Sequence, residues 1–277
     1  MDPVRKNRLS ASKTTPMQPA QNNTLSNGAD TPITPSDTQK QLAMGTTLTR
    51  HIEEGKSTVP EQHEPLVCKP QQIESWRVFK IMSEFVEGFE VLKKYGLAAT
   101  FFGTARPSFE PKFYAQATEL AGRLSKAGFA VFSGGNNGIM EAANKGAYEA
   151  GGASIGLNIK LSGTTGLNNY LTESVTFDHF FVRKVMLAFA SEVYIFFPGG
   201  FGTLDEFTEI LTLVQTKKIR KVPIVLYGKD FWNPLVAFFR DSLLTEHKAI
   251  DANDLNLFVV VDSVDEAVEY ITTNVVC

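Results

Sequence analysis

The sequence is poor in cysteine, in long apolar runs and in net charge, and each shortage excludes a class of protein. Its only cysteines, Cys68 and Cys277, are too few for a disulfide framework or a metal-ligand cluster, so we expect a reducing, cytoplasmic setting. No run approaches the roughly 18 apolar residues of a membrane span, and no apolar segment follows the basic N-terminus, so we expect neither a span nor a secretory signal. The net charge of −3 disfavours nucleic acid and an anionic membrane as partners.

Aromatic residues are absent from the first part of the chain. All 21 Phe, 7 Tyr and 2 Trp lie at or after Trp76, whereas 8 of the 13 Pro lie within residues 1–70. Such a segment lacks the apolar area that would offset the entropy lost on ordering. We therefore predict that residues 1–70 form a disordered N-terminal extension and that residues 71–277 form the folded domain.

Helical and strand-like patterns alternate from about residue 71 onward. Apolar residues at three- and four-residue spacings predict a first helix over residues 73–94. Short runs that are apolar throughout then precede glycine-bearing turns and helical stretches, which indicates a parallel sheet covered on both faces. The sequence therefore predicts a doubly wound, Rossmann-like α/β domain with roughly six or seven strands. The expected strands cover residues 97–102, 129–132, 153–157, 193–197, 222–227 and 257–261.

Three of the expected strand-to-helix turns have unusual sequences, and ligands of such sheets bind at the carboxyl ends of the strands. Glycines let a backbone approach a ligand closely, and the N–H groups that open a helix attract an anion such as phosphate, although glycine also serves ordinary tight turns. Two such turns suggest a nucleotide-sized ligand. Neither matches a P-loop or the spaced dinucleotide fingerprint. The candidate binding residues are Gly103, Thr104 and Arg106 in the first turn, Gly135 and Gly138 in the second, and Gly199, Gly200, Phe201, Gly202 and Thr203 in the third.

Charged residues near the third turn have two interpretations each. Glu206 follows Thr203 by three residues, which is the spacing of a helix capping box, and it would also place a carboxylate close to a bound phosphate. Arg183 and Lys184 are adjacent on an expected helix, so they point about 100° apart and cannot share one role. The pair is either a solvated helix face or a cation directed at the site. His179 is expected to pack or lie at the surface, because no second His or Cys stands at metal spacing.

Longer stretches of the sequence resemble the Lonely Guy (LOG) family of nucleoside 5′-monophosphate phosphoribohydrolases, whose members are often called lysine decarboxylases. The resemblance covers roughly residues 75–275 and leaves only the N-terminal region outside it. It is carried by Gly134-Gly135-x-x-Gly138-Ile139-Met140-Glu141, by Gly151-Gly152-x-Ser154-Ile155-Gly156, by Phe181-Val182-Arg183-Lys184 and by Pro198-Gly199-Gly200-Phe201-Gly202-Thr203-Leu204-Asp205-Glu206.

The resemblance implies hydrolysis of the N-glycosidic bond of AMP-like or cytokinin nucleotides to free base and ribose 5-phosphate. It assigns the catalytic arginine to Arg183, the catalytic glutamate to Glu206, and nucleotide binding to Lys184 and residues 199–203. No metal or organic cofactor is implied. Family members border their active sites with a neighbouring subunit, so we expect a homodimer or a higher homo-oligomer.

The chain departs from the family pattern at Thr164, where longer relatives carry a glutamate of the substrate site. This departure favours a second interpretation, a non-catalytic nucleotide-binding or carrier protein of the same fold. The retained Arg183 and Glu206 favour the enzyme. A pyridoxal-phosphate lysine decarboxylase has no support, because no lysine stands in a recognisable Schiff-base context.

Overall fold

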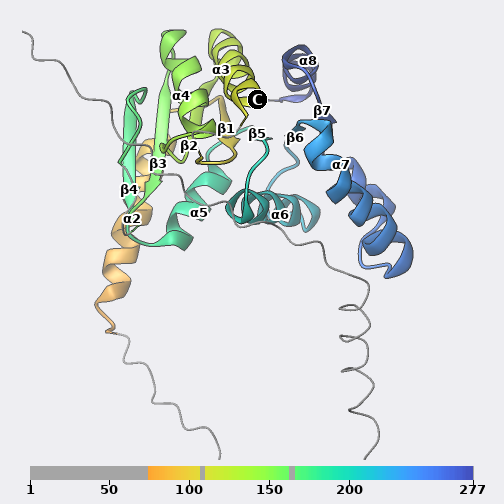
Figure 1. Ribbon diagram of the computed structural model, residues 1–277. Coiled ribbons are helices and arrows are strands. Elements are labelled where there is room, and N and C mark those ends of the chain that lie inside the picture. Colours follow the sequence, from red (N-terminus) through yellow and green to blue (C-terminus); the bar gives the residue numbers. More distant parts are fainter. Residues whose placement is uncertain (1–73, 107–109, 162–165, 277) are drawn as a thin grey trace, which may run out of the picture. The chain divides into compact units, whose positions relative to one another are not determined.

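A computed structural model describes residues 74–106, 110–161 and 166–276 of the chain. Its centre is a seven-stranded, all-parallel sheet with the strand order β4-β3-β2-β1-β5-β6-β7 (Figure 1). The predicted doubly wound α/β fold is therefore confirmed. The strands are β1 (Ala98–Phe102), β2 (Ala130–Ser133), β3 (Ser154–Ile159), β4 (Glu173–Phe177), β5 (Val193–Phe196), β6 (Ile224–Tyr227) and β7 (Val259–Val261).

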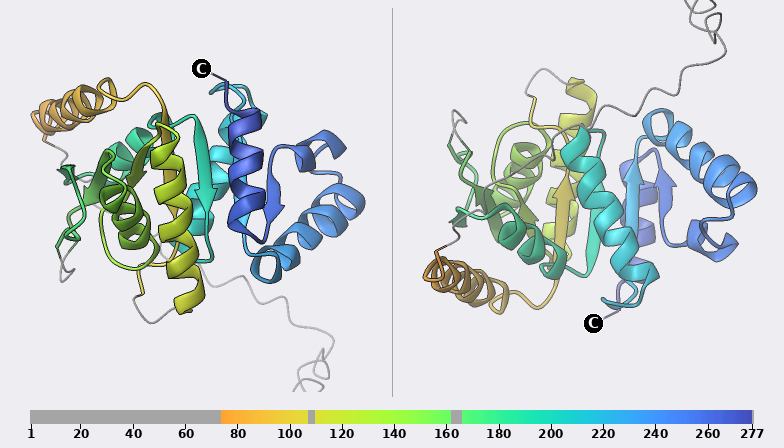
Figure 2. Two further views of the ribbon diagram at one scale, coloured as in Figure 1. Left: turned by 90° about the horizontal axis from the view of Figure 1, so that it is seen from above. Right: turned by 90° about the horizontal axis from the view of Figure 1, so that it is seen from below.

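Helices cover both faces of the sheet, as the two views of Figure 2 show. One face packs against α3 (Pro111–Lys126), α4 (Ile139–Glu149) and α8 (Val264–Asn274). The other face packs against α2 (Arg77–Leu92), α5 (Phe180–Phe189), α6 (Phe201–Gln215) and α7 (Lys229–Phe238), which continues into a π-helical segment (Phe239–Glu246). A short 3₁₀ helix (Ala252–Asn256) precedes β7. No helix of the described ranges is long and apolar enough to cross a membrane.

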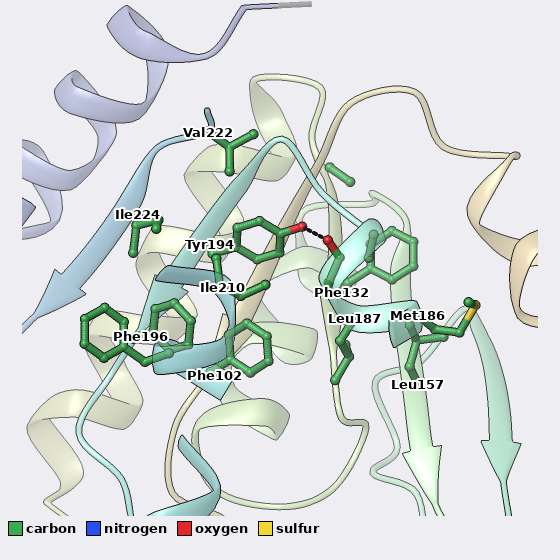
Figure 3. Packing of buried hydrophobic residues seen from close by; sticks show 14 of the residues in the cluster. Phe102, Phe132, Leu157, Met186, Leu187, Tyr194, Phe196, Ile210, Val222 and Ile224 are labelled. Atoms are coloured by element: carbon green, nitrogen blue, oxygen red, sulfur yellow. Dashed lines mark hydrogen bonds between the residues drawn. The ribbon is translucent and has the colours of Figure 1, made fainter. Parts of the chain in front are cut away.

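The central strands are buried on both faces, which explains their continuous apolar sequences. Along β5, Tyr194 and Phe196 face the α5–α6 side, whereas Val193 and Ile195 face the α3–α8 side. Figure 3 shows the first of these packing layers, where Phe102 lies parallel to Phe196 with ring centroids 4.7 Å apart. Burial of aromatic side chains of this size is the main stabilising term for such a sheet.

One strand differs from the sequence-based expectation. Strand β4 (Glu173–Phe177) lies at the edge of the sheet and alternates between covered and exposed positions, so it has no continuous apolar run. The six expected strands are present with ends shifted by one or two residues, and the first helix is shorter than predicted. Position 73, its expected start, lies outside the described residues.

The order of the strands reverses between β1 and β5, because β2, β3 and β4 follow on one side of β1 while β5, β6 and β7 lie on the other. In open α/β sheets the turns on either side of such a reversal diverge and leave room for a ligand. The loops after β1, β2 and β5 are the three unusual turns of the sequence.

Candidate active site

Backbone hydrogen bonds join the three turns. The Thr104 N–H, after β1, donates to the Pro198 carbonyl oxygen after β5 at 3.1 Å. The Thr104 carbonyl oxygen accepts from the N–H of Ile139, the first residue of α4, at 3.0 Å. A single residue of the first turn therefore fixes the positions of the other two turns.

Two glycines are required by these close approaches. Gly138 has a φ of +71°, and a Cβ at this position would lie 2.3 Å from the Thr104 carbonyl oxygen. A Cβ at Gly199 would lie 2.1 Å from Thr203 Oγ1 and 3.0 Å from the Thr104 nitrogen. Both sites are too crowded for a Cβ, so a side chain at either position would separate the turns.

Helix α6 begins earlier than the capping-box interpretation requires. Its first residue is Phe201 and its N-cap is Gly200, with no side-chain cap. Thr203 lies inside the first turn and donates its own N–H to the Gly200 carbonyl oxygen at 3.0 Å. Glu206 lies nearly a turn further on, so the capping-box interpretation is wrong. The first N–H groups of a helix have no carbonyl partner one turn earlier, so those of Phe201 and Gly202 at the start of α6 are available to an anion.

Glu206 is held by Arg183 of the preceding helix. The Arg183 Nη1 donates to Glu206 Oε1, and the two side chains are only 11% and 7% exposed. The Arg183 Nε also donates to the Leu157 carbonyl oxygen, in the carboxyl-terminal half of β3, at 3.4 Å. The pair therefore joins helices α5 and α6 and the carboxyl edge of the sheet.

Burial raises the pKa of the Glu206 carboxyl above its ordinary value, because the charged form is desolvated. The nearby charge of Glu209 acts in the same direction, whereas Arg183 and Lys184 oppose the shift. A buried carboxyl group with one specific charged partner is a candidate for proton transfer or charge stabilisation, and Glu206 with Arg183 fits this description.

Lys184 points away from this pair, as its adjacent position on α5 requires. Its ammonium group donates to Asp205 Oδ2 at 2.7 Å and lies 3.4 Å from Glu209 Oε2. Burial alone would lower the pKa of Lys184, but the contacts with Asp205 and Glu209 raise it. Lys184 therefore stays charged in this structure and is engaged by α6, so its expected role in nucleotide binding stays a prediction.

A buried polar network supports the second turn. Ser133 Oγ donates to Asn144 Oδ1 at 2.6 Å and accepts from the Gly135 N–H at 2.9 Å. Asn144 Nδ2 donates to Ser154 Oγ at 2.9 Å, and Asn168 Nδ2 reaches Asn144 Oδ1 at 3.0 Å. In the sequence Ser154 appears only as part of a motif. Its hydrogen bond with Asn144 could not be predicted, because a single polar residue in an apolar strand does not indicate which residue it contacts.

The other candidate residues lie around this centre. Phe201 is 92% exposed at the start of α6, and Arg106 is exposed after β1. Gly103 contacts Ile139, where a Cβ would lie 2.7 Å from the Ile139 Cβ. Position 164, at which the sequence departs from the family pattern, lies outside the described residues.

His179 packs away from this centre, in the interior. It is 9% exposed, and its Nδ1 lies 2.9 Å from Glu84 Oε1. Within the described ranges no group of three or more His, Cys, Asp or Glu side chains could hold a metal ion.

This geometry defines a Rossmann-like α/β protein with glycine-rich turns and a buried Arg–Glu pair at the reversal of its strand order. Residues 140–271 match the family model described as "Possible lysine decarboxylase". The resemblance of its motifs to this family, which includes the LOG proteins, is confirmed.

Curated relatives carry a common activity in their names. A probable cytokinin riboside 5′-monophosphate phosphoribohydrolase of Oryza sativa subsp. japonica is 29% identical over 62% of this chain and 74% of its own length. Other proteins with this activity in their names, from Rhodococcoides fascians, rice and Arabidopsis thaliana, are 27–31% identical, and the chain spans only 45–61% of their lengths.

One solved structure supports the fold, and a second aligns less well. The crystal structure of TM1055, a structural-genomics target, aligns with a TM-score of 0.50 at 24% identity over 64% of this chain and 99% of that protein. A molybdenum cofactor carrier protein of Chlamydomonas reinhardtii aligns with a TM-score of 0.49 at 22% identity over 64% of this chain and 96% of its own.

Proposed function

We propose that the protein hydrolyses the N-glycosidic bond of a purine-type nucleoside 5′-monophosphate, AMP or a cytokinin nucleotide, to free base and ribose 5-phosphate. The observation that carries the proposal is the buried Arg183–Glu206 pair, which lies one helical turn inside the N-terminus of α6. The names of the curated relatives support the same reaction.

The substrate phosphate binds the N–H groups that open α6, together with the turn of Thr104. The attraction of a helix N-terminus for a phosphate supports this arrangement. The ribose then extends from residues 199–203 toward Glu206. Glycosidic cleavage passes through a state with positive charge on the sugar, which a nearby carboxylate stabilises.

Glu206 acts as the carboxylate that faces C1′ and orients the attacking water. The water oxygen bonds to C1′ as the bond from C1′ to the base nitrogen breaks, and the proton that the water gives up leaves on the base. Arg183 opposes the burial-driven rise of the Glu206 pKa and so favours the ionised carboxylate. The reaction needs no cofactor.

Thr164 keeps a second candidate open, a binding or carrier protein that does not turn its nucleotide over. A panel of AMP, GMP, CMP, UMP and an N6-substituted AMP discriminates the two. The assay is chromatographic detection of free base, with adenosine as the control that lacks the phosphate. Base released from a purine monophosphate and not from adenosine supports the enzyme. Calorimetric binding without release supports the carrier.

A further inference from the structure

A glutamate and a histidine are buried together where helix α2 meets the start of α5. Glu84 of α2 is 7% exposed, and His179, just before α5, is 9% exposed. The reaction proposed above uses neither residue. A buried pair of ionisable side chains often adds no more stability than two apolar side chains of similar size, because both groups lose their water. Stability alone therefore does not account for this pair.

Both carboxylate oxygens of Glu84 contact the same residue. Oε2 accepts from the His179 backbone N–H at 3.1 Å, and Oε1 lies 2.9 Å from His179 Nδ1. His179 is the N-cap of α5, and its own side chain caps no N–H group of the helix. Two hydrogen bonds to one carboxylate fix both the position and the direction of a residue. Glu84 therefore holds the point at which α5 begins.

Arg183 is bonded directly to this point. Its backbone N–H donates to the His179 carbonyl oxygen at 3.2 Å, so Arg183 lies one helical turn after the N-cap. The Arg183 guanidinium donates to Glu206, and its Nε donates to the Leu157 carbonyl oxygen. An α-helix rises about 1.5 Å and turns about 100° per residue, so even a partial shift of α5 along its axis would separate Arg183 from Glu206.

A second contact between the same helices lies on the other side of Arg183. Gly88, one turn after Glu84 on α2, lies so close to α5 that a Cβ there would come within 2.4 Å of Met186 Sδ. Met186 follows Arg183 by three residues, whereas His179 precedes it by four. Helix α2 therefore contacts α5 both before and after Arg183, and the two helices lie side by side on one face of the sheet (Figure 2).

We propose that Glu84 and His179 form a positioning pair for Arg183, and this proposal rests on the reaction proposed above. The carboxylate of Glu84 holds His179, His179 sets the start of α5, and the helix directs the guanidinium of Arg183 at Glu206. The pair acts through Arg183 rather than on the substrate. A displacement of about 1 Å in a catalytic group can lower a rate by about a hundredfold, so the pair controls turnover.

The first test compares Glu84→Met with Ile271→Ala in the full chain. Glu84→Met keeps the length of the side chain, removes both acceptor oxygens, and should lower kcat for AMP at least about tenfold. KM should change little, because the proposed phosphate site is formed by the turns after β1 and β5 and not by α5. Ile271→Ala opens a cavity beneath α8, across the sheet, and is the stability control. It should leave kcat unchanged when both variants are assayed well below their Tm.

The second test changes the histidine. His179→Asn places an amide N–H close to the position of Nδ1 and should retain most of the activity, whereas His179→Leu should lower kcat as Glu84→Met does. Asp178→Asn is the control at the neighbouring position. It removes a surface ion pair with Lys80 and should leave kcat unchanged.

A double variant separates position from stability. Glu84→Met combined with His179→Leu replaces the buried pair by two apolar side chains, an exchange that often costs little stability. The double variant should have a Tm close to that of the unsubstituted chain and still lose turnover. It also serves as the test if either single variant does not fold.

The position of Arg183 is measured without turnover by nuclear magnetic resonance. In a chain labelled with ¹⁵N, the side-chain Nε–H signal of Arg183 is assigned by its loss in Arg183→Lys. Glu84→Met should shift this signal and speed its exchange with water, whereas Asp178→Asn should do neither. If no nucleoside monophosphate is hydrolysed, the proposed function fails, and this measurement still tests whether the pair positions Arg183.

An Arg183 signal that is unchanged in Glu84→Met would overturn the proposal whatever the rate. In an active chain, so would a kcat that survives in Glu84→Met, or one that falls equally in Ile271→Ala. A loss of kcat in Glu84→Met, in His179→Leu and in the double variant, with His179→Asn active and the Arg183 signal shifted, would support it.

Discussion

The guanidinium of Arg183 lies where the side chain of residue 134 would otherwise stand. A Cβ at Gly134 would come within 2.9 Å of Arg183 Nη2 and 2.6 Å of Met140 Sδ. Both neighbours are the ends of flexible side chains, so they can move aside without moving the backbone. Gly134 therefore determines where the Arg183 side chain lies, and the backbone fold does not depend on it.

Gly134→Ala should reduce turnover while leaving stability nearly unchanged. The added methyl group displaces Arg183 from Glu206, and we expect kcat/KM to fall by about tenfold or more, as misplacement of catalytic groups does. Tm measured by calorimetry should change by only a few degrees. Gly96→Ala is the control that should change neither quantity, because a methyl group added at Gly96 would have no neighbouring atom within 4 Å.

Glu206→Gln should abolish base release without unfolding the protein. The amide keeps the size of the carboxyl group but removes the charge that would face the developing positive sugar, and the loss should be on the order of a hundredfold or more in kcat. Circular dichroism and AMP binding monitor the fold and the phosphate site. Turnover close to that of the unsubstituted protein would refute a catalytic role for this residue.

The pH dependence of activity should follow the charges around Glu206. Burial raises its pKa above the ordinary 4.5, so the acidic limb of the kcat/KM profile should lie above that pH. Glu209→Gln removes a like charge and should move the limb to lower pH. Lys184→Met removes an opposite charge and should move it to higher pH. Shifts in one common direction would show that another group controls the limb.

The contribution of Glu206 to stability should fall as the pH rises. The folded-state pKa of Glu206 is above its unfolded value of 4.5, so its protonated form favours the fold. This contribution is fully present below the unfolded value and is lost as the pH rises through the folded one. Denaturant titrations from pH 4 to pH 7 should therefore show Glu206→Gln gaining stability relative to the unsubstituted chain as the pH rises.

The N-terminal region should be dispensable for the reaction. Residues 1–70 contain no aromatic residue and most of the prolines, so the sequence offers little apolar area to attach them to the domain. Limited proteolysis should cut this region first, and a chain beginning at Pro70 should retain its Tm and its rate of base release. A severalfold change in rate or a different assembly size would show that the region docks on the domain.

The sequence predicts best those strands that are buried on both faces of the sheet. The central strands are covered on both faces, so apolar runs such as 193–197 reveal them directly. Strand β4 was not predicted because an edge strand is covered on one side and alternates like many loops. The start of α6 was misplaced because a Thr–x–x–Glu spacing indicates a capping box only where the Thr is the N-cap. In the structure the N-cap is Gly200, three residues before Thr203.

The candidate site was predictable in its position but not in its pairings. The glycine turns and the strand order bring Arg183 and Glu206 to one edge of the sheet, and the motifs pointed to both. Which acidic group each cation contacts depends on how α5 crosses α6, and no local pattern encodes this angle. The pairing of His179 with Glu84, 95 residues away, is likewise set by packing alone.

The network of Ser133, Asn144 and Ser154 bears on how fast and how tightly a ligand can bind. Its three side chains are fully buried, and they tie the second turn to two strands and a helix before any ligand arrives. A turn fixed in this way loses little conformational entropy on binding, so more of the contact energy remains as affinity. It also needs no slow rearrangement, so association should approach the rate set by diffusion and orientation.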